Sequence, residues 1–249
     1  HGQKVEMSRL ENPQELAPML NEQIQVAYRL EGQRFIEPGP YVQSLADAVV
    51  KRGGVIRAGA EVVHVAKGDR PAVILADGSR EEADKVVVAT GAWLPGLARE
   101  YGVKTLVQAG RGYSFSVATD IPAKHSVYLP HHRMACTPYE GRFRIAGTME
   151  FRGPDEPFQQ GRVDAIVSQA KKVMRGIDFN DRQDEWVGSR PVTPDGRPLI
   201  GQTKAENIYV AGGHGMWGVV LGPATGKYLA ELMATGNTNP IIKPFDPLR

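Results

Sequence analysis

The sequence predicts a mixed α/β fold, an α+β arrangement in which one chain builds a layer of buried strands and a separate antiparallel sheet. Two short runs, residues 86–89 and 208–211, are apolar at successive positions, as is typical of parallel strands covered on both faces. Between these runs, residues 105–148 hold several short strands that alternate between apolar and polar positions. A chain that leaves one domain, builds a second and returns to the first accounts for this order.

The first elements are short and precede the sheet. Asn12 as N-cap and Pro13 at the first helical position predict a helix over residues 13–20. Residues 25–28 and 34–36 are predicted to pair as short strands. The apolar positions of residues 41–51 recur with a helical period, and Gly53-Gly54 ends that helix.

The middle of the chain is predicted to be mostly β. Strands are expected over residues 55–57, 61–65, 72–75 and 86–89, followed by a short helix over residues 94–101. The antiparallel sheet is expected to contain residues 114–117, 127–129, 134–138 and 142–146, with a hairpin turn at Glu140-Gly141. A helix over residues 160–175, a strand over 207–211 and a closing helix over 217–234 complete the chain. Pro223 predicts that the regular part of that last helix begins only there.

Composition and charge exclude several classes of function. The chain has 249 residues and carries 30 basic and 28 acidic side chains, a net charge of +2. This balance argues against nucleic acid or an anionic membrane as the main partner. Cys136 is the single cysteine, so an intrachain disulfide is impossible and a reducing, cytoplasmic compartment is the simpler expectation, with peripheral attachment to the inner membrane as a variant of it. No apolar run approaches the length of a transmembrane helix.

The strongest chemical signal is a glycine-rich turn after the strand over 207–211. Gly212-Gly213-His214-Gly215 leads to Met216, Trp217 and Gly218 and then to a helix. Glycines allow backbone N–H groups to approach a ligand closely, and the helix dipole favours negative charge at that end. The alternative is a plain strand–turn–helix in which the glycines only permit tight packing.

Two further segments carry weaker signals. The strand over 86–89 ends in Thr90-Gly91, where small residues would let a cofactor pass over the strand end, or where Thr90 would simply cap a helix. Residues 186–201 are dense in proline and glycine around Arg190 and Arg197. Arg190 can bind a carboxylate through two parallel hydrogen bonds, although a surface arginine on a rigid loop is the alternative.

In combination, these segments resemble the family of glycine oxidase and FAD-dependent D-amino-acid oxidases and dehydrogenases, and most closely its bacterial D-amino-acid dehydrogenase branch. The resemblance covers nearly the whole chain and includes the strand that ends in Thr90-Gly91-Ala92-Trp93, the segment 111–114, the segment 142–150, and residues 188–201 and 213–215. It implies a partial FAD-binding Rossmann-like layer, over residues 31–104 and 186–249, and a substrate-binding antiparallel-sheet domain, over residues 1–30 and 105–185.

The resemblance also implies site residues. Arg190 matches the arginine that binds the substrate carboxylate, and Tyr128 matches a substrate-side tyrosine, although a core tyrosine in a strand is an equal alternative. The residues that match positions around the FAD are Val62, Thr90, Gly91, Trp93, Gly213, His214, Gly215, Met216, Trp217, Gly218 and Val219. No metal site and no catalytic acid or base are assigned.

The family pattern breaks at the N-terminus. The family begins with a strand, a Gly-x-Gly-x-x-Gly turn and a helix, and these 249 residues contain no such fingerprint at their start. We therefore expect an N-terminally truncated chain that alone binds FAD weakly and is inactive, with an N-terminal segment or a second chain completing the FAD site.

The function implied for the intact enzyme is oxidation of D-amino acids to 2-oxo acids and ammonia by hydride transfer to FAD. Two alternatives remain at this point: a secondary-amine oxidase of the sarcosine or proline type, and a non-catalytic fragment or assembly module. The sequence alone does not name the amino-acid side chain or the electron acceptor.

Overall fold

A computed structural model describes residues 5–139 and 141–249, and the chain divides into two compact units. The first unit comprises His1–Ala48, Gly112–Glu150 and Pro157–Gly188, and the second comprises Val49–Arg111, Phe151–Glu156 and Ser189–Arg249. These ranges differ from the expected ones chiefly at residues 31–48 and 105–111. The difference arises because the unit boundaries fall inside long strands and a helix, whereas the sequence-based boundaries were placed at loops.

The main sheet of the first unit is antiparallel and has the strand order β11-β7-β10-β9-β8. The predicted single sheet is therefore confirmed, with longer strands than expected. Arg142 pairs with Tyr139, so β9 and β10 join where the hairpin turn was predicted; Glu140 lies outside the described residues. The strand bounds are β7 (Gln108–Thr119), β8 (Val127–Leu129), β9 (Met134–Tyr139), β10 (Arg142–Phe151) and β11 (Ile177–Val192).

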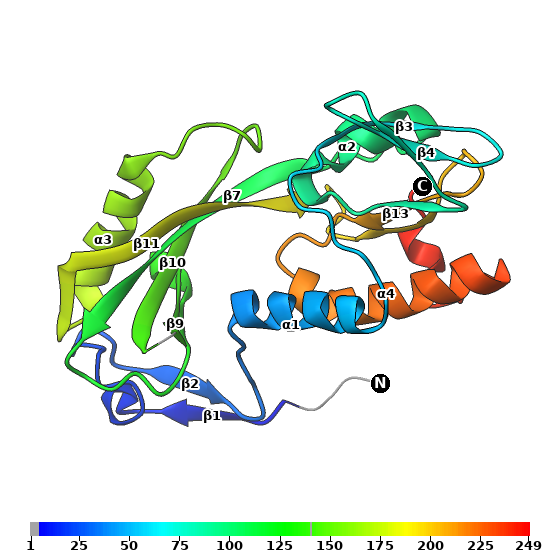
Figure 1. The fold of residues 1–249 in the computed structure, drawn as a ribbon. Coiled ribbons are helices and arrows are strands. Elements are labelled where there is room, and N and C mark those ends of the chain that lie inside the picture. The colour runs from blue at the N-terminus through cyan, green and yellow to red at the C-terminus, as the bar shows by residue number, and fades with distance from the viewer. Residues whose placement is uncertain (1–4, 140) are drawn as a thin grey trace. The chain divides into compact units, whose positions relative to one another are not determined.

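Helix α3 (Gln160–Val173) packs on one face of this sheet, as Figure 1 shows beside β10 and β11. The side chains of β7 alternate between the two faces, so Tyr113, Phe115 and Val117 enter the core beneath the helix. Val163 and Ile166 meet them from α3. This core fixes one face of the sheet and leaves the other face to the alternate residues of each strand.

The N-terminal segment of the first unit differs most from prediction. Only Pro13–Glu15 is helical, as the 3₁₀ turn η1, and β2 (Ala27–Leu30) pairs with β1 (Met7–Leu10). The predicted pairing of residues 25–28 with 34–36 is wrong, because the backbone partners of β2 come from β1. Helix α1 (Pro38–Lys51) begins earlier than predicted, since proline is well suited to a first helical turn.

The second unit contains a three-stranded sheet in the order β12-β13-β6. Strands β13 (Ile208–Gly212) and β6 (Val86–Val88) are parallel, as predicted, and β12 (Leu199–Gln202) is antiparallel to β13. Helix α4 (Gly218–Thr235) packs on this sheet through Leu229 and Leu232, which meet Tyr209. Helix α2 (Leu94–Ala98) and the 3₁₀ turn η3 (Arg99–Tyr101) contribute to a second core with β6.

A smaller antiparallel sheet completes the second unit, with the order β3-β4-β5. Its strands are β3 (Val62–Ala66), β4 (Ala72–Leu75) and β5 (Arg80–Glu82). The strand predicted over residues 55–57 is not formed. The Tyr101 hydroxyl donates to the carbonyl of Val65, which ties η3 to β3.

Helix α4 begins at Gly218, so the prediction that its regular part starts at Pro223 is wrong. A proline inside a helix lacks one N–H donor, and the packing of Leu229 and Leu232 further along holds the helix against this loss. Across residues 5–139 and 141–249, none of the helices combines the length and the apolar character that crossing a membrane requires.

Candidate functional site

The two turns singled out in the sequence follow adjacent parallel strands of the second unit. Val88 of β6 is in register with Val210 of β13, and both strands run in the same direction. Thr90-Gly91 therefore leaves the sheet at the same edge as Gly213. The carboxyl ends of parallel strands are where α/β sheets bind ligands.

Thr90 occupies the N-cap position of the 3₁₀ turn η2 (Gly91–Trp93), but its side chain makes no capping hydrogen bond. Its Oγ1 is buried and has no hydrogen-bond partner among the described residues. A buried hydroxyl without a partner is costly, at about 1–3 kcal/mol. Helix capping therefore does not explain Thr90, whereas a polar ligand atom at the strand end would satisfy it.

The glycines of the two turns divide into two kinds. Gly91 and Gly215 have φ of +56° and +55°, and a side chain at either would meet nothing within 4 Å. Gly213 has φ of +71°, and a Cβ there would lie 2.9 Å from Cγ2 of Thr193. Gly213 is thus required for packing, while Gly91 and Gly215 leave open space over the strand ends. The packing role expected for the glycine-rich turn is therefore seen at Gly213, and the ligand role remains a prediction for Gly215.

The glycine turn leads directly into α4, whose N-cap is Trp217. The first N–H groups of this 18-residue helix point toward the turn, an end that favours negative charge. His214 bonds through Nε2 to Oγ1 of Thr225, 2.8 Å away, and burial lowers the pKa of its imidazole. The hydrogen bond to Thr225 ties the turn to the helix. Met216, Trp217 and Val219 are exposed apolar residues beside it.

The segment that holds Arg190 is bonded to the same turn. The backbone N–H of Gly215 donates to the carbonyl of Pro191 at 2.8 Å. Ser189 Oγ donates to the carbonyl of Pro154 at 3.2 Å. Arg190 lies between these two contacts, is half-buried, and has an extended backbone within β11. Arg190 therefore directly precedes Pro191, the residue whose carbonyl is hydrogen-bonded to the glycine turn.

Trp93 adds a further link at this edge of the second unit. Its indole Nε1 donates to both carboxylate oxygens of Asp155, at 2.9 and 3.1 Å. Asp155 and Pro154 were not identified from the sequence, and no local pattern around them distinguishes them from other loop residues. Their contacts arise only because residues 151–156 return to the second unit.

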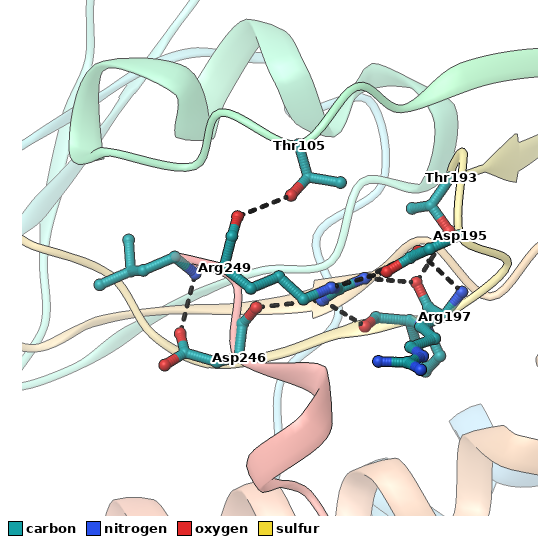
Figure 2. A network of polar contacts seen from close by, with 8 residues as sticks. Thr105, Thr193, Asp195, Arg197, Asp246 and Arg249 are labelled. Carbon is teal, nitrogen blue, oxygen red and sulfur yellow. Dashed lines mark hydrogen bonds and ion pairs between the residues drawn. The ribbon is translucent and has the colours of Figure 1, made fainter.

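The turn over residues 193–198 is held by Arg249, as Figure 2 shows. Arg249 pairs with Asp195 through two hydrogen bonds of 2.9 and 3.1 Å and lowers the pKa of that carboxyl well below its usual range. Arg197 contributes its backbone to this network, whereas its side chain is exposed. Thr193, whose hydroxyl donates to the Arg197 carbonyl, is the residue that faces Gly213.

Two of the predicted residues lie elsewhere. Tyr128 belongs to the first unit, in β8, with 71% of its surface exposed, so it is not a core tyrosine. Val62 opens β3 in the smaller sheet of the second unit, and its side chain packs against the core that contains Val88. Among the described residues, no group of three histidine, cysteine, aspartate or glutamate side chains could hold a metal ion.

A model of one protein family, described as FAD dependent oxidoreductase (DAO), matches residues 1–232 of the chain. The chain belongs to this family. Its cofactor is therefore FAD, and it is a flavin-dependent oxidoreductase.

Several solved structures share the fold of this DAO-family oxidoreductase. Glycine oxidase from Geobacillus kaustophilus superposes with a TM-score of 0.88 at 24% identity, over 99% of this chain and 68% of that one. L-proline dehydrogenase from P. horikoshii gives a TM-score of 0.81 at 20% identity, over 98% and 68% of the two chains. L-α-glycerophosphate oxidase from Mycoplasma pneumoniae, with FAD bound, gives 0.80 at 19% identity, over 98% and 68%. At these identities the likeness shows the fold.

The strand-end edge of the second unit fits FAD on the observations above. The partnerless Thr90 hydroxyl offers a polar atom to a ligand, and the space over Gly91 and Gly215 admits one. The amino end of α4 suits the negative charge that a reduced flavin carries.

Proposed function

We propose that this protein oxidises D-amino acids to 2-oxo acids and ammonia. The observation that carries the proposal is the junction of three segments at one edge of the second unit. Thr90 and the glycine turn stand at adjoining strand ends, and the Gly215 N–H donates to the carbonyl next to Arg190. The backbone hydrogen bond between Gly215 and Pro191 thus joins the segment of the proposed carboxylate anchor to the proposed flavin-binding turn.

The residues proposed to hold FAD are those at or near the strand ends. Thr90, Gly91 and Trp93 would lie along the cofactor after β6, and Gly213, His214, Gly215, Met216, Trp217, Gly218 and Val219 would lie along its ring after β13. Val62 is proposed to face the adenine through its backbone. FAD, when bound, supplies the two-electron acceptor for the hydride that leaves the substrate Cα.

The chain's own contribution is binding and orientation. Arg190 would grip the substrate carboxylate with two parallel hydrogen bonds, and Pro191 restricts the Arg190 backbone to an extended form that helps to fix the direction of the side chain. The substrate amine is neutral, so its oxidation requires no strong base from the protein. Burial lowers the pKa of the His214 imidazole and so makes it a weaker base, which agrees with this mechanism. Positioning would then supply most of the rate enhancement.

The first unit is proposed to be the substrate-binding domain. Its antiparallel sheet would form a wall of the substrate site, and Tyr128 is exposed on it and able to meet a ligand. The imino acid that leaves after oxidation is hydrolysed by water, which gives the 2-oxo acid and ammonia.

The test of Arg190 compares two conservative variants in the FAD-loaded enzyme. Arg190→Lys retains the charge but loses the bidentate geometry, so we expect kcat/KM for amino acids to fall by about 30-fold, or about 2 kcal/mol, the lower end for a partly buried charge pair. An amine substrate without a carboxylate should lose much less. Arg197→Lys is the control, because the Arg197 side chain is exposed and only its backbone is used. If Arg197→Lys loses activity and Arg190→Lys does not, Arg190 is not the anchor.

A secondary-amine substrate is the second candidate. It is favoured by the fold shared with L-proline dehydrogenase and with iminodiacetate oxidase from Chelativorans sp. BNC1, whose structure gives a TM-score of 0.78 at 20% identity. The carboxylate anchor would be the same and the pocket shape different. Substrate-driven loss of the visible flavin absorbance separates the candidates. Bleaching by D-alanine but not by sarcosine or proline supports the first, and the reverse supports the second.

A further inference from the structure

The sheet of the first unit has one face against α3 and a second face formed by the alternate residues. On β10, Phe143 and Ile145 belong to the core beneath α3. Their neighbours Arg142 and Arg144 therefore point to the opposite face, which we call the open face. Ser114 and Ser116 belong to this side of β7, because Tyr113, Phe115 and Val117 fill the core, but both serines are buried and only the arginines above them are partly exposed.

The first of these arginines is fully engaged with the protein. Arg142 Nη1 pairs with a carboxylate oxygen of Asp181 at 2.9 Å, and Nη2 donates to the carbonyl of Asp181. Its Nε donates to Ser116 Oγ at 3.1 Å. Asp184 accepts from the same Ser116 hydroxyl at 2.9 Å. The positive charge of Arg142 is thus neutralised, and its donors are used to hold β11 against β7 and β10.

Arg144, two residues further on the same face, has no such partner. Its Nη2 donates to Ser114 Oγ at 2.9 Å, and its Cζ lies 6.0 Å from the centroid of the Trp186 ring. No carboxylate of residues 5–139 and 141–249 forms an ion pair with it. Burial lowers the pKa of the Arg144 guanidinium, so the charge has lost part of its hydration without gaining a counter-charge.

The Trp186 ring is partly exposed and lies over Gly188 of the same strand. A Cβ on Gly188 would lie 2.2 Å from Cη2 and 2.7 Å from Cζ2 of the indole, so the ring occupies the space that the missing side chain leaves. An aromatic ring that stacks on a guanidinium leaves the in-plane N–H donors available to a planar acceptor.

We propose that the Arg144 guanidinium, positioned by the buried Ser114 hydroxyl and by Trp186, is a carboxylate-binding site on the open face, and that it selects amino-acid substrates that carry a second carboxylate. The substrate part of this inference rests on the proposed function, whereas the carboxylate site stands without it. A single uncompensated guanidinium matches one negative charge and one planar pair of oxygens. A phosphate would need more positive charge than this face offers, because Asp181 already neutralises Arg142.

The test measures selectivity in the FAD-loaded enzyme with matched substrates, D-glutamate and D-glutamine. We expect the wild type to prefer D-glutamate in kcat/KM by about tenfold, the ratio that corresponds to 1.4 kcal/mol. Arg144→Gln should bring the ratio close to one and leave D-glutamine oxidation nearly unchanged. Arg29→Gln removes an exposed charge from the same unit, where Arg29 pairs with Glu31, and should keep the wild-type ratio. An unchanged ratio in Arg144→Gln, or an equal loss in Arg29→Gln, overturns the inference.

A binding measurement separates this inference from the proposed function. Glutarate is titrated calorimetrically into the wild type, Arg144→Gln and Arg29→Gln. If no amino acid is oxidised by the wild type, the proposed function fails, but loss of glutarate binding in Arg144→Gln alone still supports the carboxylate site. Equal glutarate binding by all three proteins overturns it. Should Arg144→Gln fail to fold, Gly188→Ala displaces the Trp186 ring without changing charge, and it should weaken glutarate binding if the site is correct.

Discussion

Arg249 offers the sharpest test of how the loop beside the candidate site is held. Its side chain forms two hydrogen bonds with the Asp195 carboxylate and donates to the carbonyls of Arg197, Pro198 and Asp246 at 2.9–3.0 Å. Figure 2 shows this network around the turn over residues 193–198. Arg249→Met keeps most of the aliphatic stem and removes every one of these donors.

The expected loss of stability in Arg249→Met depends on how far solvent reaches the two side chains of the ion pair. The Arg249 side chain is 20% exposed, but that of Asp195 is 39% exposed, so solvent screens the ion pair and limits it to about 1 kcal/mol or less. Each bond to a backbone carbonyl adds a net contribution of about 0.5–1 kcal/mol. We therefore expect Arg249→Met to lower the free energy of unfolding by about 2–3 kcal/mol. For a chain of this size that is a fall in Tm of about 5–10 °C.

The loss of stability in Arg249→Met should decrease as the pH falls. The hydrogen bond from Arg249 is the largest cause of the lowered pKa of Asp195. A carboxyl whose pKa is depressed in the folded state stabilises the protein above its unfolded pKa, about 4, and this contribution is lost as the pH falls through the folded value. The difference between the wild type and Arg249→Met should therefore be largest near neutral pH and shrink in acid below about pH 4.

The assay is urea unfolding at fixed FAD concentration, with Asp195→Asn and the double variant completing a cycle. The cycle isolates the coupling between the two side chains. We expect a coupling of about 0.5–1 kcal/mol near neutral pH. A loss below about 0.5 kcal/mol in Arg249→Met, the size of an ordinary surface substitution, would refute the reasoning.

Two further predictions concern single positions. Cys136 lies in the core of the first unit, where burial raises the pKa of its thiol to about 12, so we expect a thiol reagent to label it only at the rate of unfolding; rapid labelling of the native protein would contradict this. Gly213→Ala should destabilise the protein by at least about 2 kcal/mol more than Gly196→Ala, measured by urea unfolding, because both positions have positive φ but only at Gly213 does a Cβ meet Thr193 and Leu199. Equal losses of unfolding free energy in the two variants would contradict this prediction, because the contact between the new Cβ and Thr193 would then cost nothing.

The sequence determined the elements whose signal is local. Strands β6 and β13 are neighbours as expected, with Val86 and Val88 buried, although Val87 is 38% exposed and β6 is therefore covered on one face only. The alternation of β7 and β10 places Phe115 and Phe143 in one core. The glycine in the predicted hairpin turn also indicated the right position, since Gly141 has a positive φ and directly precedes Arg142, which pairs with Tyr139. In each case the residues that form the sequence pattern are themselves buried or lie in the turn, so the element can be predicted from one segment of the sequence.

The elements that the sequence missed owe their conformation to a partner. Strand β11 (Ile177–Val192) is a polar, sixteen-residue edge strand without regular alternation, and only its pairing with β7 makes it β. The failed pairing of residues 25–28 with 34–36 has the same origin, because β1 supplies the backbone donors and acceptors that β2 uses. Strand propensity depends on which strand lies alongside.

The candidate sites show the same division. Composition and motif order were enough to single out Thr90, the glycine turn and Arg190, because small residues after a buried strand and an arginine before a proline are visible in one segment. Only the tertiary structure left the Thr90 hydroxyl without a partner and bonded Gly215 to Pro191. Arg142 and Arg144 are indistinguishable as a local pattern. They differ because Asp181, thirty-seven or more residues away in the chain, neutralises one guanidinium and leaves the other uncompensated, and charge compensation is a property of the folded surroundings.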